Sequence, residues 1–232
     1  MMKMYTTRNV INCSMLIKSL SKKIGILILF FVFASSSASA QNVTIGASNY
    51  TTLKAAFDAI NAGVHTGAIV ATVNLSTTET ATAQLNSSGT GAANYTSVLV
   101  RPSATVTISG NLATSIIKLA GADNVTIDGI NGGSQMTITN SSTSNAASVV
   151  WVASASASNG ATNNIIRNCV ITGNGPTTTG FGISSSGSTA NGSVAETANS
   201  NNTYQNNTIN TCRAGIVLVG PTGNESGNII SN

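Results

Sequence analysis

The sequence is poor in charged and aromatic residues, which make up 7% and 4% of its 232 positions. Its basic residues are unevenly placed, because five of the ten lie within the first 40 residues, where there is no acidic residue. From residue 41 onward, five basic residues stand against six acidic residues, which gives a formal charge of −1. The excess positive charge therefore belongs to the N-terminal segment, and binding of nucleic acid through a basic face has no support in the composition.

Long apolar runs are also missing from most of the chain. After residue 40 no run approaches the roughly 20 apolar residues that a membrane-spanning helix needs, so we expect no membrane span there. A low content of charge is compatible with disorder as well, but Val and Ile recur regularly along the chain, which argues against a disordered protein. We therefore expect a β protein rich in Asn, Thr, Ser and Gly.

Residues 1–40 have the pattern of a secretory signal peptide. Lys22 and Lys23 precede ten apolar residues at 24–33, and small residues end the segment at 38–40. This order of a basic region, an apolar region and small residues at positions −3 and −1 is what signal peptidase recognises. We predict cleavage after residue 40 and a secreted or outer cell-surface protein, with either Met1 or Met15 as the true start.

Cysteine is scarce, since only Cys169 and Cys212 remain after the expected cleavage. Two thiols do not make a disulfide scaffold, although an oxidising location would permit a bridge. The strand register derived below offsets the two along the chain. We expect structural, mostly buried cysteines and keep a Cys169–Cys212 disulfide as the alternative.

An N-terminal cap is predicted at residues 41–66. A short strand at 43–45 is followed by a helix over Leu53–Asn61, with Thr52 at its N-cap and Gly63 just beyond its end. The apolar residues of the helix recur at i, i+3, i+4 and i+7 and form one stripe: Leu53, Ala56, Phe57 and Ile60. We expect this stripe to cover the first layer of a stack.

Residues 67–232 contain an internal repeat. Four apolar residues that each begin a short Val/Ile-rich segment are spaced 33 residues apart: Ile117, Val150, Ile183 and Ile216. A second motif has an apolar residue, one polar residue and then Gly or Asn: Ile127-Asp128-Gly129, Ile166-Arg167-Asn168, Tyr204-Gln205-Asn206 and Ile230-Ser231-Asn232. Gly and Asn tolerate left-handed backbone angles, so the recurring final residue predicts a tight bend in each unit. Ile171 and Ile209 follow two of these bends and begin a third strand.

Units with the same order of strands stack in the same direction and pair each strand with its equivalent in the next unit. The fold class we predict is therefore all-β, a parallel β-helix or solenoid with an N-terminal capping strand and amphipathic helix. Because the sequence stops at Asn232 in the middle of a unit, we expect the β-helix to be incomplete at its C-terminal end.

The repeats carry a family resemblance over roughly residues 50–232. The segments 182–183, 202–209, 215–218 and 228–232 resemble the right-handed parallel β-helix repeats of pectate-lyase-like proteins, and 117–129 is similar to segments of large secreted surface proteins of Bacteroidota-type bacteria. The resemblance implies right-handed coiling and a capping role for the helix. It does not specify an activity, because the same repeats occur in lyases, hydrolases, epimerases and adhesins.

The acidic residues offer little for catalysis. Asp123 and Asp128 are the only close pair and flank one strand. Acid catalysis on sugars needs two carboxyl groups within about 5 to 10 Å on either side of the bond, and calcium needs several converging oxygens. If Val125 and Ile127 face inward, a turn and a residue before the bend explain both acids. We assign no catalytic, cofactor-binding or metal-ligating residue and expect no cofactor.

Three other residues have alternative readings. His65, the sole histidine, is expected to be a solvated loop residue, because no Cys or acid lies beside it. Arg167 is expected on a solvated outward face, while the resemblance to lyases would make it a candidate base. Trp151 faces outward between Val150 and Val152 and either stacks on a sugar ring or packs under the loop 153–162.

Two functional hypotheses follow. In the first, the protein is a non-enzymatic structural or adhesive module at the cell surface, with polar faces of Thr, Ser and Asn and a polysaccharide or cell-surface glycan as partner. In the second, it is the N-terminal part of a polysaccharide lyase or glycoside hydrolase whose catalytic residues lie beyond residue 232. The sparse acidic residues favour the first.

Overall fold

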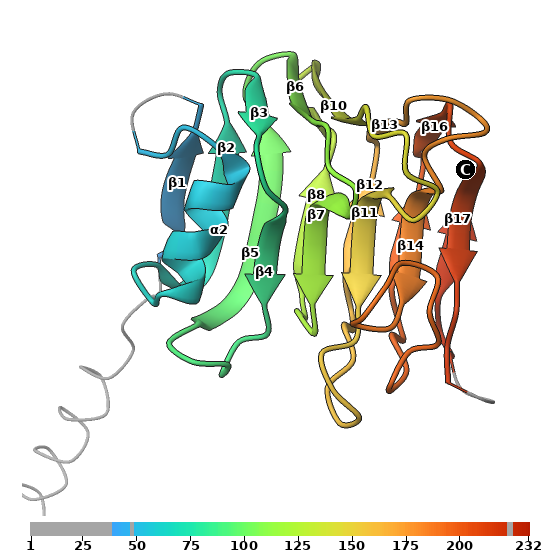
Figure 1. Ribbon diagram of the computed structural model, residues 1–232. Coiled ribbons are helices and arrows are strands. Elements are labelled where there is room, and N and C mark those ends of the chain that lie inside the picture. The colour runs from blue at the N-terminus through green and yellow to red at the C-terminus, as the bar shows by residue number, and fades with distance from the viewer. Residues whose placement is uncertain (1–38, 47–48, 222–224) are drawn as a thin grey trace, which may run out of the picture. The chain divides into compact units, whose positions relative to one another are not determined.

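The computed structural model describes residues 39–46, 49–221 and 225–232, and residues 39–232 form one compact unit. Almost all regular structure in the described residues is β, and the strands lie in three sheets (Figure 1). One helix, α2 (Leu53–Asn61), matches the predicted range. None of the helical structure described is long and apolar enough to cross a membrane.

The strands of each sheet are parallel and hydrogen-bond in a fixed order. Sheet A contains β1 (Gln41–Ile45), β2 (Thr66–Val73), β5 (Asn94–Pro102), β8 (Val125–Asp128), β12 (Ile165–Arg167), β15 (Thr203–Gln205) and β18 (Ile229–Ser231). Sheet B contains β3 (Thr77–Glu79), β6 (Val106–Gly110), β10 (Ser134–Asn140), β13 (Val170–Thr172) and β16 (Thr208–Asn210), and the short β9 (Ile130–Asn131) pairs antiparallel with β10. Sheet C contains β4 (Ala83–Asn86), β7 (Ser115–Ala120), β11 (Ser148–Ala153), β14 (Phe181–Ser186) and β17 (Ala214–Leu218).

The chain visits sheets A, B and C in the same order again and again, and we call one such passage a coil. Figure 1 shows the strands arranged from β1 and α2 at one end to β16 and β17 at the other. This arrangement is compatible with the predicted β-helix or solenoid. The unpredicted strands β3 and β4 lie in the first coil, where Thr, Gln and Glu replace the Val/Ile pattern of later coils.

The predicted columns of stacked residues are present. In sheet C, Ile117 pairs with Val150, Val150 with Ile183, and Ile183 with Ile216. In sheet A the same relation joins Ile127, Ile166, Tyr204 and Ile230, and in sheet B it joins Ile108, Ile138, Ile171 and Ile209. The sheet C strands begin two residues earlier than predicted, because backbone pairing continues over residues such as Ser115 and Ser148 that are not Val or Ile.

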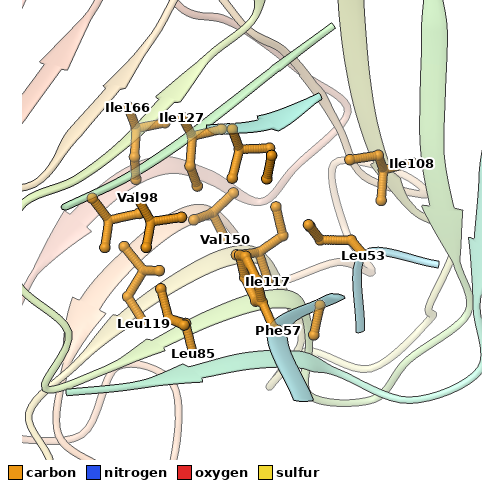
Figure 2. Close-up of a cluster of buried hydrophobic side chains, with 14 of the residues drawn as sticks. Leu53, Phe57, Leu85, Val98, Ile108, Ile117, Leu119, Ile127, Val150 and Ile166 are labelled. Atoms are coloured by element: carbon orange, nitrogen blue, oxygen red, sulfur yellow. The ribbon is translucent and has the colours of Figure 1, made fainter. Parts of the chain in front are cut away.

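The inward-facing side chains form one continuous hydrophobic core. Ile117, Val150, Ile127 and Ile166 are fully buried, and Figure 2 shows them gathered with residues of helix α2. Burial of such aliphatic side chains stabilises the fold by about 1.5 to 3 kcal/mol each. Because each coil buries its interior against its neighbours, the coils stabilise one another.

The helix covers the first coil as predicted. Leu53, Ala56, Phe57 and Ile60 are all fully buried, and the hydroxyl of Thr52 accepts a hydrogen bond from the backbone N–H of Ala55 at 3.1 Å. The carboxylate of Glu79, only 2% exposed, accepts bonds from the backbone N–H groups of Leu53 (3.0 Å) and Lys54 (2.9 Å). A carboxylate at this position satisfies otherwise unpaired N–H groups and complements the helix dipole, so Glu79 fastens α2 to sheet B.

The predicted left-handed bend is only partly correct. Asn168 and Asn206 adopt positive φ angles of 57° and 52°, whereas Gly129 does not. Gly129 is required for another reason: a Cβ atom there would lie 2.2 Å from the carbonyl oxygen of Asn168 in the next coil. The position thus combines a bend with close backbone contact between coils.

A further column, which the sequence motif did not reveal, is a ladder of asparagines, of which Asn164 and Asn202 are buried. The side-chain oxygens of Asn164, Asn202 and Asn228 accept hydrogen bonds from the backbone N–H groups of Val125 (2.9 Å), Asn164 (2.9 Å) and Asn202 (2.8 Å), respectively. Each asparagine therefore joins its own coil to the preceding one. The ladder explains part of the high Asn content, because an amide both donates and accepts and can satisfy backbone groups at a corner.

Candidate functional site

The outward face of sheet A carries the largest set of charged side chains in register. Strand pairing places a row of polar residues across the sheet, which we call the charged row: Thr72, Arg101, Asp128, Arg167, Gln205 and Ser231. These residues alternate along each strand with inward-facing core residues. Neighbouring members are separated by the strand spacing of about 4.8 Å.

Both carboxylate oxygens of Asp128 accept hydrogen bonds. Its Oδ2 accepts from Nε of Arg167 at 2.8 Å and lies 2.8 Å from Nη2 of the same guanidinium. Its Oδ1 accepts from Nδ2 of Asn168 at 2.8 Å and from the backbone N–H of Ile130 at 3.2 Å. The side chain of Asp128 is 13% exposed, and its partner Arg167 is 41% exposed. With both oxygens occupied and the charge balanced, Asp128 acts as a structural acceptor.

Arg101 differs from Arg167 in having no hydrogen-bond or ion-pair partner among the side chains that the structure describes. Its Nε atom is buried and makes no hydrogen bond, and its guanidinium forms no ion pair within the described part of the chain. A buried N–H without an acceptor costs about 1 to 3 kcal/mol. The remaining N–H groups of this planar cation can donate to a ligand in a fork geometry.

A second row lies beside the charged row, two residues earlier in each strand. We call it the aliphatic row, because four of its six members are Val, Leu or Ile: Val70, Leu99, Thr126, Ile165, Thr203 and Ile229. All six side chains are at least partly exposed. Sheet A therefore presents apolar surface and hydrogen-bonding groups in parallel rows.

The outward face of sheet B is polar and uncharged. In register across its strands lie two rows rich in Thr and Ser: Thr107, Thr137, Val170 and Thr208 in one, and Thr78, Ser109, Thr139, Thr172 and Asn210 in the other. This face fits the expectation of broad polar surfaces.

The outward face of sheet C is covered around Trp151, whereas Gln84 in the same outward row on β4 is exposed. The indole is 4% exposed, its Nε1–H donates to Oγ of Ser186 at 2.9 Å, and Nζ of Lys118 lies 3.8 Å from the ring centroid. Lys118 also donates to the carbonyl oxygen of Ser188 at 3.0 Å. The packed alternative for Trp151 is thus correct. The segment 187–196, which follows β14, contributes to the cover, because Trp151 lines a small hollow together with Thr189, Ala190 and Asn191.

The covering segment is held by Glu196. Its carboxylate accepts hydrogen bonds from the hydroxyl of Ser154, from the backbone N–H of Ser188 and from the Ser188 hydroxyl at 2.7 Å. Burial raises the pKa of Glu196, but these hydrogen bonds outweigh it and bring the pKa to about 2. Burial beneath the same segment lowers the pKa of Lys118, and the nearby Glu196 charge partly opposes that shift.

The other candidate residues have structural roles. Oδ1 of Asp123 accepts from the backbone N–H and the hydroxyl of Thr162, both at 2.7 Å, and Asp123 lies two residues before β8, whereas Asp128 is its last residue. His65 is not simply solvated as expected: its Nε2 lies 2.8 Å from the Tyr50 hydroxyl. Its half-buried ring thereby connects the loop before β2 to the cap.

The two cysteines are free. Burial raises the pKa of Cys169 to about 12 and also raises the pKa of Cys212, so neither is an activated nucleophile. Within residues 39–46, 49–221 and 225–232, no group of three or more His, Cys, Asp or Glu side chains is placed to hold a metal ion.

A hollow at the end of the stack, of about 550 Å³, is lined by Tyr204, Ile209, Ile216 and Ile230 together with neighbouring polar residues. It is the open interior of the last coil and contains no ionisable carboxylate, imidazole or amine among its lining side chains.

Comparison with known proteins leaves the chain without an assigned family: no family description, no characterised protein and no solved structure matches it.

Proposed function

We propose that the chain is a secreted or cell-surface module of structural or adhesive function that contacts carbohydrate through the outward face of sheet A. The observation that carries the proposal is the unpartnered Arg101 within the charged row, directly beside the aliphatic row. A sugar ring has apolar C–H faces and a rim of hydroxyl groups. It therefore needs apolar contact and hydrogen-bonding groups side by side, which these two rows supply.

The geometry favours a polymer over a single sugar. Both rows continue at the strand spacing of about 4.8 Å, so a chain of sugars laid across the strands meets one member of each row at each coil. Arg101 contributes free guanidinium donors, and Gln205 contributes an amide. The ion pair of Asp128 with Arg167 holds the centre of the row in place, because both groups are fixed by the 2.8 Å contacts.

We further propose that the fold is a right-handed parallel β-helix of the pectate-lyase-like kind and that it is exported. The repeated order of sheets A, B and C supports the β-helix. The apolar segment 24–33, preceded by Lys22 and Lys23, supports export. The formal charge of −1 after residue 40 supports a partner other than nucleic acid.

A catalytic function has less support. Glycoside hydrolysis uses two carboxyl groups about 5 to 10 Å apart, but Asp123 lies before β8, Asp128 ends it, and the two carboxylates bind different partners. An arginine base is disfavoured because the guanidinium stays protonated, and Arg167 is additionally paired with Asp128.

Binding of residues 41–232 to a panel of plant and bacterial polysaccharides, measured by affinity electrophoresis and calorimetry, tests the proposal. Arg101→Ala should weaken binding about 10- to 100-fold, the effect of losing hydrogen bonds from a charged donor. Arg213→Ala is the matched control, because Arg213 is exposed outside the two rows. Binding that survives Arg101→Ala, or no binding to any polymer, would overturn the proposal.

The same panel tests the alternative of an enzyme. We expect no turnover of uronic-acid or neutral polysaccharides. Turnover that disappears in Asp128→Ala or Arg167→Ala would show that the sheet A face is catalytic and that the adhesive proposal is wrong.

A further inference from the structure

The side-chain amide of Gln41 lies among hydrogen-bond donors at the start of β1. Its Oε1 accepts from the backbone N–H of Thr66 at 3.2 Å and lies 3.3 Å from Nδ1 of His65. Its nitrogen Nε2 makes no hydrogen bond to any residue that the structure describes. The carbonyl end of this amide is therefore held by two groups, whereas its nitrogen end is not.

The two ring nitrogens of His65 have different partners, and these partners fix the position of its proton. An amide oxygen only accepts hydrogen bonds, so Nδ1 carries the proton that points to Oε1 of Gln41. Nε2 then accepts from the hydroxyl of Tyr50, which lies 2.8 Å away. Tyr50 thus holds His65 in the tautomer that donates to Gln41.

The proposed export gives this arrangement a reactive group, and the reaction proposed below rests on cleavage after residue 40. Ser39 and Ala40 are exposed, and cleavage after them converts the backbone nitrogen of Gln41 into a free α-amine. Only Cα, Cβ and Cγ separate this amine from Cδ, so an attack within the residue needs no second molecule. The two donors at Oε1 lie where negative charge develops when an amine adds to the amide carbon.

We propose that Gln41 is a site of self-modification, at which the mature N-terminus cyclises to pyroglutamate with the help of Thr66 and His65. The neutral α-amine attacks Cδ and forms the C–N bond of a lactam ring, while Oε1 takes up negative charge. The N–H of Thr66 and Nδ1–H of His65 stabilise that charge. The Cδ–Nε2 bond then breaks, and Nε2 leaves as ammonia with the proton that the amine gives up.

The product retains the polar groups that the start of β1 needs. The ring keeps one N–H and one carbonyl oxygen, so Gln41 still has a donor and an acceptor beside its partner Ile69 in β2. The positive charge of the α-amine is lost, and aminopeptidases find no free amine. Cyclisation therefore closes the N-terminus of an exported chain without disturbing the cap.

The rate of cyclisation in folded and unfolded protein tests the proposal. Residues 41–232 are released from a removable leader so that Gln41 comes first, and the loss of one ammonia is followed by intact-mass spectrometry. The folded protein should cyclise at least about 10-fold faster than the same protein in urea, where the two donors no longer surround Oε1. Equal or slower cyclisation in the folded protein would overturn the proposal.

Substitutions at residue 65 test the donor itself. His65→Phe should slow the folded protein at least about 5-fold, because it removes one of two donors to the reacting oxygen. His65→Asn should keep most of the rate, since its amide nitrogen can replace Nδ1. Val64→Ala is the matched control and should leave the rate unchanged, because this neighbouring side chain is 63% exposed. All of these proteins should cyclise alike in urea.

Tyr50 is a positioning residue, and a double substitution distinguishes this role from a general effect on the cap. Tyr50→Phe should slow cyclisation when residue 65 is His but not when it is Asn, because an amide has no tautomer to fix. Fluorescence of Trp151 checks that each variant is folded. A folded His65→Phe protein that cyclises at the wild-type rate would overturn the role of His65.

The reaction and the export that precedes it are tested separately. A different first residue in secreted material would overturn the proposed cleavage, and with it a pyroglutamate in the mature protein. Agreement between the folded and unfolded rates would overturn the assisted cyclisation alone, because that comparison starts from a chain whose first residue is already Gln41.

Discussion

Asp128 and Arg101 occupy neighbouring places in the charged row, yet their surroundings give them different properties. Asp128 receives bonds from Arg167, Asn168 and Ile130, whereas Arg101 retains a buried Nε without an acceptor. Charge-assisted hydrogen bonds are stronger than those between neutral groups, so the bonds of Asp128 stabilise the fold. Arg101 instead keeps N–H groups that can donate to a ligand. The type of residue alone does not distinguish the two.

Glu196 has a pH dependence whose sign follows from its lowered pKa. A carboxyl group with a pKa of about 2 in the folded protein, against an ordinary value of 4.5, contributes stability that is fully present above 4.5. That contribution is lost as the pH falls toward 2. Because Glu196 is bonded to Ser154 and Ser188, acidification should loosen the segment 187–196 and expose Trp151 to water.

Tryptophan fluorescence checks this prediction without a label, since Trp151 is the only tryptophan. We expect the emission maximum of the wild-type protein to move to longer wavelength between about pH 4.5 and 2. Glu196→Gln should show the longer wavelength already at neutral pH and little change in that range. An identical titration in the two proteins would contradict the assigned role of Glu196.

At the scale of elements, the turns that precede the sheet A strands help the strands to keep the coils in register. The sheet A strands of the last four coils are only three or four residues long. Each is preceded by an asparagine or glycine with positive φ: Asn124, Asn163, Asn201 and Gly227. The buried amides of Asn164 and Asn202 connect these corners, so short strands with few hydrogen bonds of their own still keep their register.

Replacing Asn202 should therefore destabilise two coils at once. Its oxygen accepts from the N–H of Asn164, and its Nδ2 donates to the carbonyls of Ala161 and Asn199. Asn202→Ala leaves these buried groups without partners, and we expect a loss of about 2 to 4 kcal/mol in the free energy of unfolding. Urea denaturation measures this loss.

Asn210→Ala, at an exposed position, is the control and should change the free energy of unfolding by less than about 0.5 kcal/mol. Equal losses in the two variants would contradict the role of the asparagine ladder.

The whole molecule combines a closed end, made by α2, with a long stack of coils whose outward faces differ. Sheet A presents charge and aliphatic surface, sheet B presents Thr and Ser, and sheet C is covered around Trp151. These differences arise although all three sheets share one core. The proposed ligand face is therefore confined to sheet A.

At the scale of the whole molecule, the proposed export predicts which residue begins the mature protein. Ser39 and Ala40 are exposed, and β1 begins directly afterward at Gln41, whose Oε1 accepts from the N–H of Thr66 at 3.2 Å. Cleavage between Ala40 and Gln41 would leave the cap strand whole. Intact-mass and N-terminal analysis of secreted material should find Gln41 as the first residue; mature protein that retains the segment 22–33 would contradict this.

The sequence by itself determined the repeating part of the structure. The columns of Ile117 and Ile127 and the helix Leu53–Asn61 were predictable because periodicity, capping and tolerance of left-handed angles are properties of short segments. The polar first coil, with β3 and β4, lacked that periodicity and was not predicted, since its strands form by pairing with β6 and β7.

Only the tertiary structure decided which distant side chains meet. Glu79 reaches the N-terminus of a helix 26 residues earlier, Asp128 meets Arg167, and Trp151 lines a hollow with residues 189–191, some 40 residues later. The loops between strands differ in length, and the path of each loop depends on the coils on which it packs. These paths decide which side chains come into contact. The partners of Asp128 and the lack of a partner for Arg101 follow from side-chain geometry between coils, which no spacing along the chain specifies.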